Sequence, residues 1–185
     1  MTNLINILLF QAGWFAAILG GANGMPVLGT LLVAALVALH LARSPQPGDE
    51  FVLVATAGLL GALFDSALAS TGWVVYTSGQ LAAGTAPYWI VAMWVLFATT
   101  LNVSLRWLKG RWLLASLLGA AGGPLAYFAG ARLGGLEFGN MVAGLSAIGL
   151  GWGILMPVLM SLSNRFDGWN PRRGAPVLQR QLVEE

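Results

Sequence analysis

Long apolar stretches with almost no charge are the feature that most limits how this chain can fold. A helix needs roughly 20 consecutive apolar residues to cross the hydrocarbon core of a bilayer, which is about 30 Å thick. Six segments approach or exceed that length, at about residues 4–20, 25–43, 51–71, 85–107, 111–131 and 140–163. Because backbone polar groups inside lipid must be satisfied within the segment itself, we predict that each of them is a helix.

The overall composition agrees with a membrane location. Hydrophobic residues make up 57% of the chain and charged residues only 9%, whereas soluble domains carry about 25% charged residues. We therefore predict an all-α, polytopic membrane helix bundle with about six transmembrane helices in residues 1–164, followed by a polar cytoplasmic tail in residues 165–185. The first segment has no basic residues before it and no small-residue cleavage site after it, so we expect a retained helix rather than a cleaved signal peptide.

The basic residues predict the orientation. If the chain crosses the membrane six times, one side holds every Lys and Arg residue except Arg132. Positively charged loops stay in the cytoplasm, so we predict that both termini are cytoplasmic. The loop between the third and fourth segments, residues 72–84, would then rest on the outer membrane surface.

Asp65 is the acidic residue that this topology places within the membrane. Counting from Phe51 puts it roughly 21 Å above the cytoplasmic boundary, where an ionised carboxylate is costly and is therefore a candidate functional group. The alternative is a neutral Asp65 that forms a structural hydrogen bond to a neighbouring helix. Tyr127 should lie at a similar depth, and Arg132 roughly 10 Å higher, where its side chain either reaches down to Asp65 or stays at its helix end.

A second group of polar residues lies nearer the cytoplasm. Thr99, Asn102 and Arg106 are spaced by three and four residues, which keeps them on one face of the fourth predicted helix. Gln11 and His40 fall at comparable depths on the first two helices. These five side chains either line a vestibule open to the cytoplasm or form ordinary hydrogen bonds between helices, each typically worth less than about 1 kcal/mol.

The fifth segment contains both small residues and a proline. Gly119 and Gly123 belong to a face of small residues that predicts close helix packing. Pro124 follows Gly122 and Gly123 and should bend the helix, because it removes a backbone donor. We consider Gly122, Gly123 and Pro124 a candidate hinge, with a static kink as the alternative.

Several kinds of chemistry are disfavoured. The chain has no Cys and one His, which excludes thiolate chemistry and a clustered-histidine metal site, and we expect neither a metal nor a cofactor. His40 and Asp65 should lie roughly 16 Å apart in depth, which argues against a Ser–His–Asp hydrolase. A formal charge of +2 is too small to indicate a nucleic-acid partner.

Three stretches resemble an uncharacterised bacterial membrane family, domain of unknown function 2878. They are residues 8–15 (LLFQAGWF), residues 96–107 (LFATTLN followed by SLRW after one residue) and residues 122–130 (GGPLAY, then AG). The resemblance covers nearly the whole chain and implies a small multi-pass protein of the inner membrane of Gram-negative bacteria. The family supplies no activity to carry over. The resemblance also implies, loosely, that genes of this family lie beside genes for lipid-modifying proteins.

Three functional hypotheses follow. The first is an accessory or scaffold protein in lipid modification or envelope maintenance, with membrane lipids and either a second copy or another membrane protein as partners. The second is a small proton-linked transporter that uses Asp65. The third is a membrane-embedded lipid-modifying enzyme with Asp65 or His40 as acid or base, although the sequence leans away from an enzyme.

Overall fold

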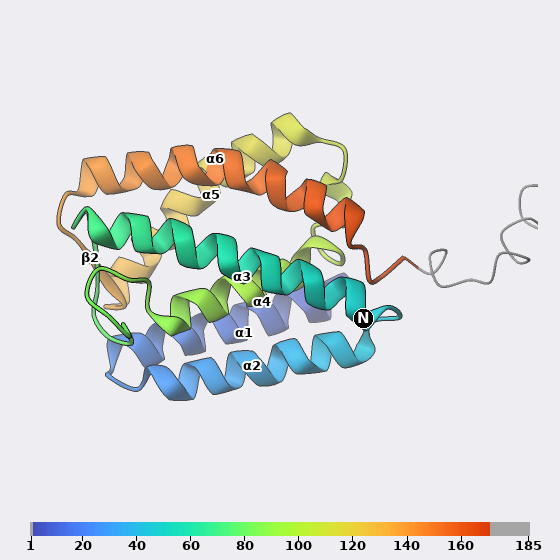
Figure 1. Ribbon diagram of the computed structural model, residues 1–185, viewed down its shortest axis with the longest axis horizontal. Helices are drawn as coiled ribbons and strands as arrows, with labels where there is room; N and C mark the ends of the chain where they lie inside the picture. Colours follow the sequence, from blue (N-terminus) through green and yellow to red (C-terminus); the bar gives the residue numbers. More distant parts are fainter. Residues whose placement is uncertain (1, 171–185) are drawn as a thin grey trace, which may run out of the picture.

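The computed structural model describes residues 2–170, which form a helix bundle with one small sheet. Its elements in chain order are α1 (Asn3–Ala22), α2 (Pro26–Arg43), α3 (Pro47–Ser70), β1 (Val74–Tyr76), α4 (Tyr88–Leu101), the 3₁₀ turn η1 (Arg106–Leu108), α5 (Trp112–Arg132), β2 (Leu136–Phe138) and α6 (Met141–Arg165). Figure 1 shows these helices running back and forth along one long axis, with the start of α1 and the end of α6 at the same end. The predicted all-α bundle is confirmed.

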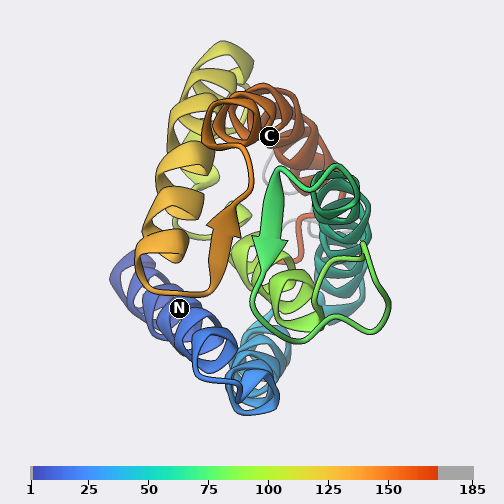
Figure 2. The same ribbon diagram turned by 90° about the vertical axis from the view of Figure 1, so that its left-hand side faces the viewer.

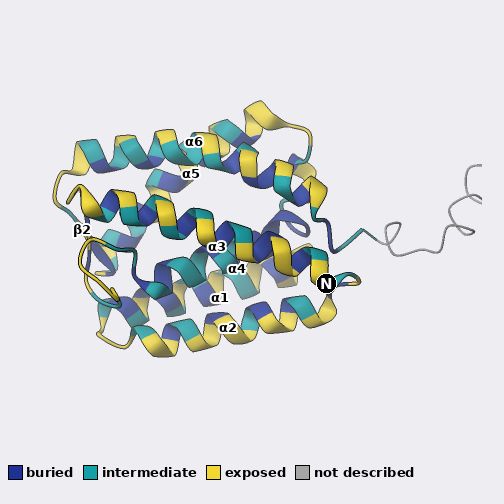
Figure 3. Cartoon of the chain, in the orientation of Figure 1, coloured by how far each residue is buried: buried dark blue, intermediate teal, exposed yellow. Residues whose placement is uncertain are grey.

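The outer surface of the bundle is apolar, as a membrane protein requires. In the described part of the chain, α1, α2, α3, α5 and α6 are each long and apolar enough to cross a membrane. Leu59, Leu63, Leu150 and Ile154 are all more than 60% exposed, and Figure 3 shows exposed residues along the outer faces of the helices. Such a surface matches lipid rather than water, and the protein is a membrane protein.

Helix α4 is shorter than the sequence predicts. The expected helix reached residue 107, but α4 ends at Leu101 after 14 residues, a length of about 21 Å. Beyond that point the chain turns, and the backbone N–H of Leu105 donates to the carbonyl of Thr100 at 2.8 Å. Figure 2 shows α4 inside the ring formed by the other helices, where Trp89 and Trp94 are buried. A short helix suffices there because its neighbours, rather than lipid, surround it.

The loop after α3 forms a strand that the sequence analysis missed. β1 pairs antiparallel with β2, with Val74 opposite Phe138 and Tyr76 opposite Leu136. Val74 and Tyr76 are buried whereas Val75 is exposed, so this part of the loop packs onto the end of the bundle. We call this end of the bundle the sheet end. The opposite end, which carries Arg43, Arg106, Lys109, Arg111 and Arg165, is the basic end.

Close packing of α5 on α6 follows the predicted small residues. A Cβ atom added to Gly119 would lie 2.3 Å from the carbonyl oxygen of Trp152, and one added to Gly123 would lie 2.5 Å from Cγ of the same residue. These contacts require glycine at both positions, and they let the indole of Trp152 reach the centre of the bundle.

Candidate functional site

Asp65 is the centre of a buried hydrogen-bond cluster. Its carboxyl group is fully buried, and its Oδ1 accepts from the hydroxyl of Tyr76 at 2.5 Å and from that of Tyr127 at 2.6 Å. Its Oδ2 accepts from Nε1 of Trp94 at 2.6 Å. Four elements (α3, β1, α4 and α5) therefore meet at one carboxyl group, which we call the Asp65 cluster.

Arg132 lies apart from this cluster. It is exposed at the end of α5, and the ion pairs found among residues 2–170 do not join it to Asp65. The sequence left two positions open for Arg132, paired with Asp65 or at its helix end, and the structure places it at the helix end. Neutral donors take its place around Asp65.

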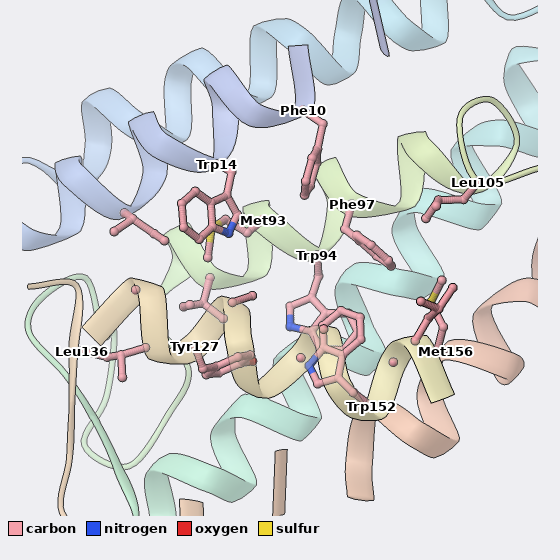
Figure 4. Close-up of a pocket in the computed structure, with 18 of the residues that line it drawn as sticks. Phe10, Trp14, Met93, Trp94, Phe97, Leu105, Tyr127, Leu136, Trp152 and Met156 are labelled. Atoms are coloured by element: carbon pink, nitrogen blue, oxygen red, sulfur yellow. The ribbon is translucent and has the colours of Figure 1, made fainter. Parts of the chain in front are cut away.

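An apolar pocket lies beside the Asp65 cluster. Its volume is about 460 Å³, and Figure 4 shows its lining side chains converging from α1, α4, α5 and α6. Two of the lining residues, Trp94 and Tyr127, are also donors to Asp65. The ring of Trp94 stacks on Trp152 with centroids 4.4 Å apart and an angle of 16° between the planes. Asp65 and this stacking therefore fix one wall of the pocket.

The pocket opens on the outer surface of the bundle along α5. Gly122 and Ala126 line the pocket and are exposed, and a Cβ atom added to Gly122 would meet no atom within 4 Å. Helix α1 packs chiefly against α2 and α4, whereas α5 packs against α6. The pocket therefore opens on the side of the bundle, between α1 and α5.

A second polar cluster is buried at the basic end. Glu50, which is fully buried in the first turn of α3, has its Oε1 2.7 Å from Nε2 of His40. Its Oε2 accepts from Nδ2 of Asn102 at 2.8 Å and from the backbone N–H of Gly168 at 3.2 Å. The cluster ties the end of α2 and the start of α3 to the segments that follow α4 and α6.

Asn102 extends this network to two cations. Its side-chain oxygen accepts from Nζ of Lys109 at 2.7 Å, and its carbonyl accepts from Nε of Arg106 at 2.9 Å. Both cations also bind Asp167, at 2.8 Å for Lys109 and 2.6 Å for Arg106. Burial lowers the pKa of the Lys109 ammonium below its ordinary value, and the hydrogen bond to Asp167 opposes that effect in part.

The five residues considered for a vestibule do not line one opening. His40, Asn102 and Arg106 belong to the closed network at the basic end. Thr99 is buried a helical turn earlier, where its carbonyl accepts from Asn6, and Gln11 is exposed on α1. The expectation of a shared helix face is wrong because α4 ends at Leu101, before Asn102 and Arg106.

The candidate hinge lies within an unbroken α5, which contains Pro124. Gly123 is packed against Trp152, whereas Gly122 faces open space beside the pocket. The two glycines therefore have different roles in the structure: Gly123 permits helix packing and Gly122 leaves the pocket open.

Several important residues escaped the sequence analysis. Glu50 follows a proline and an acidic neighbour, a pattern that indicates an exposed helix start rather than a buried acid. Trp94 lies in a uniformly apolar segment, and Tyr76 lies in a loop. The alternation of Val74, Val75 and Tyr76 was the one signal for a half-buried strand. The predicted tail from residue 165 lies mostly outside the described residues, but residues 166–170 pack against the basic-end network.

Comparison with known proteins identifies the family. The model of a family described as protein of unknown function (DUF2878) matches residues 3–158. The chain belongs to this family. The matched range contains the whole Asp65 cluster and the whole pocket, so both lie in the region that defines the DUF2878 family. No curated protein and no solved structure matches the chain.

Proposed function

We propose that this DUF2878 protein is a lipid-binding accessory protein that holds one apolar lipid chain in the pocket between α1, α4 and α5. The observation that carries the proposal is an apolar cavity of about 460 Å³ whose open side lies on the apolar outer surface of the bundle, along α5. This volume is within the range of about 300–1,000 Å³ that is usual for small-molecule sites.

The lining of the pocket favours hydrocarbon over a polar ligand. The lining residues are aromatic, aliphatic, methionine or glycine, and none carries a formal charge. The hydroxyl of Tyr127 is already engaged by Asp65. Since burying a polar group without a partner costs free energy, an acyl or isoprenoid chain is the best-matched occupant.

The same geometry ranks the alternatives. All three donors around Asp65 come from side chains that also build the bundle, which supports a positioning role for Asp65 rather than proton transport. Among residues 2–170, Tyr127 is the one titratable residue that lines the pocket, which supports binding rather than chemistry. We therefore favour an accessory role in lipid handling over transport or catalysis, and we propose the bacterial inner membrane as its location, with the basic end in the cytoplasm.

The test is to fill the pocket from its open side. In Gly122→Leu the new side chain meets no protein atom near its Cβ, and leucine is favoured over glycine in a helix by roughly 0.8 kcal/mol. The matched control is Ala121→Leu, since Ala121 is exposed on the same helix and does not line the pocket. Lipid retained by the purified proteins would be counted by native mass spectrometry.

We expect Gly122→Leu to lose most of the retained lipid, whereas Ala121→Leu keeps the wild-type amount. Equal retention by all three proteins would show that lipid is bound elsewhere or only as a general annulus, and it would refute the proposal.

A further inference from the structure

The pocket extends to the basic end of the bundle. Its lining runs from Leu136 and Gly130 near the sheet end to Leu105, Trp107 and Leu108 beyond the end of α4. Trp107 lines the pocket and is itself 50% exposed, and we take this half-exposed ring as the mouth of the pocket at the basic end. A chain lying in the pocket would therefore carry its headgroup close to the basic residues that follow α4.

Most of the cations near that mouth already have anionic partners. Arg106 and Lys109 both bind Asp167. Arg111 differs, since none of the ion pairs among residues 2–170 involves it and its side chain is exposed. Its guanidinium carbon lies 6.0 Å from the centroid of the Trp107 ring, which lines the pocket. Within the described chain, Arg111 thus adds a positive charge without a protein counter-ion beside the mouth.

The opposite end has no such excess of positive charge among the described residues. Arg132 and Glu137 are both exposed near the sheet end, and their opposite charges balance. An anionic headgroup would therefore be attracted to the basic end and not to the sheet end.

We propose that the occupant is an amphiphile with an anionic headgroup, bound with its carboxylate or phosphate at Arg111 and its hydrocarbon chain in the pocket. This inference rests on the proposed function. A guanidinium suits both headgroups because it can donate two parallel hydrogen bonds to either. The sources that share this chemistry are a free fatty acid and an acidic phospholipid.

The test compares lipids that share one chain and differ in headgroup. Oleate, lysophosphatidylglycerol with an oleoyl chain, and neutral oleyl alcohol would be titrated against the wild type, Arg111→Gln and Gly122→Leu in uncharged detergent. Arg132→Gln is the matched control, because it makes the same charge change at the other end of α5. Binding would be measured by native mass spectrometry at low ionic strength.

We expect Arg111→Gln to weaken binding of the two anionic lipids by about two- to fivefold, the size typical of an exposed ion pair. Binding of oleyl alcohol should not change, and Arg132→Gln should match the wild type with all three lipids. A preference between oleate and lysophosphatidylglycerol would identify the headgroup.

Three other outcomes separate the two proposals. If Gly122→Leu abolishes binding but Arg111→Gln affects no lipid, or affects oleyl alcohol equally, the headgroup assignment is wrong and the pocket proposal stands. The headgroup assignment is equally wrong if Arg132→Gln alone weakens binding of the anionic lipids. If Gly122→Leu leaves all binding unchanged, the pocket proposal itself fails.

Discussion

Replacing Asp65 by alanine should remove the hydrogen bonds that join four elements at the centre of the bundle. The substitution deletes three hydrogen bonds at once, from Tyr76, Tyr127 and Trp94, at 2.5–2.6 Å. These three donors would remain in a fully buried site with no carboxylate to accept from them. The strand β1 and the helices α4 and α5 would lose their shared contact with α3.

The expected loss can be bounded from two scales. Hydrogen bonds between helices in membranes average about 0.6 kcal/mol each, which gives roughly 2 kcal/mol for three. Bonds to an ionised group are worth about 1.5–3 kcal/mol each, which gives at least roughly 4.5 kcal/mol. We therefore expect Asp65→Ala to lower the free energy of unfolding by about 2–5 kcal/mol.

Asp65→Asn should cost less than Asp65→Ala. An amide can donate to the two tyrosine oxygens and accept from the indole of Trp94, but the two tyrosine hydroxyl hydrogens then lose their acceptor. The matched control is Ser66→Ala, which removes a single acceptor, that of the backbone N–H of Ala86. Its cost should be about 1 kcal/mol.

The assay is reversible unfolding in mixed micelles, followed by tryptophan fluorescence. The stacked pair of Trp94 and Trp152 lies next to the substituted site, so tryptophan emission should change when the packing around Asp65 is lost. If the unfolding free energy of Asp65→Ala lies within 1 kcal/mol of the wild-type value, or if the loss is no larger than that of Ser66→Ala, the cluster does not hold the bundle together and our reasoning is wrong.

Two further predictions concern packing and pH. Gly61→Ala should destabilise the fold by about 1–3 kcal/mol, because the added Cβ would lie 2.0 Å from Cγ of Trp94. The Trp94 ring cannot move away without breaking its hydrogen bond to Asp65. The control is Gly153→Ala, whose Cβ would meet nothing closer than 3.4 Å and which should show no such loss in the same unfolding assay. Burial lowers the pKa of Lys109 from its ordinary value of 10.5, so between the lowered pKa and 10.5 the unfolded chain binds more protons and stability rises with pH. The difference in unfolding free energy between the wild type and Lys109→Met should therefore move in favour of the wild type as the pH rises through that window, and a difference that stays flat or falls would contradict the burial argument.

The sequence alone determined the class of fold, because membrane-spanning helices depend on local length and composition. Five long helices lie where apolar segments predicted them, with ends shifted by a few residues. The small residues of α5 likewise predicted that α5 packs closely on another helix, because glycines at helical spacing let two helix backbones approach each other within a membrane. In the structure that helix is α6. The basic residues gather at one end of the bundle for a reason that is also local, namely their position in the connecting loops.

Only the tertiary structure decided where α4 ends and what the polar residues do. The helical spacing of the polar residues predicted that the fourth helix continues past Asn102 to residue 107. In the structure the helix ends before Asn102, whose side chain donates to Glu50 and to the carbonyl of Phe166. The sequence pattern did not predict these two contacts. The Asp65 cluster joins Tyr76, Trp94 and Tyr127 from three other elements; counting residues along the helices placed Tyr127 at the depth of Asp65 but predicted neither this hydrogen bond nor the other two donors. No local pattern specifies such a meeting, because a hydrogen bond between distant segments depends on how the helices pack, and the pocket beside it is the space that this packing leaves.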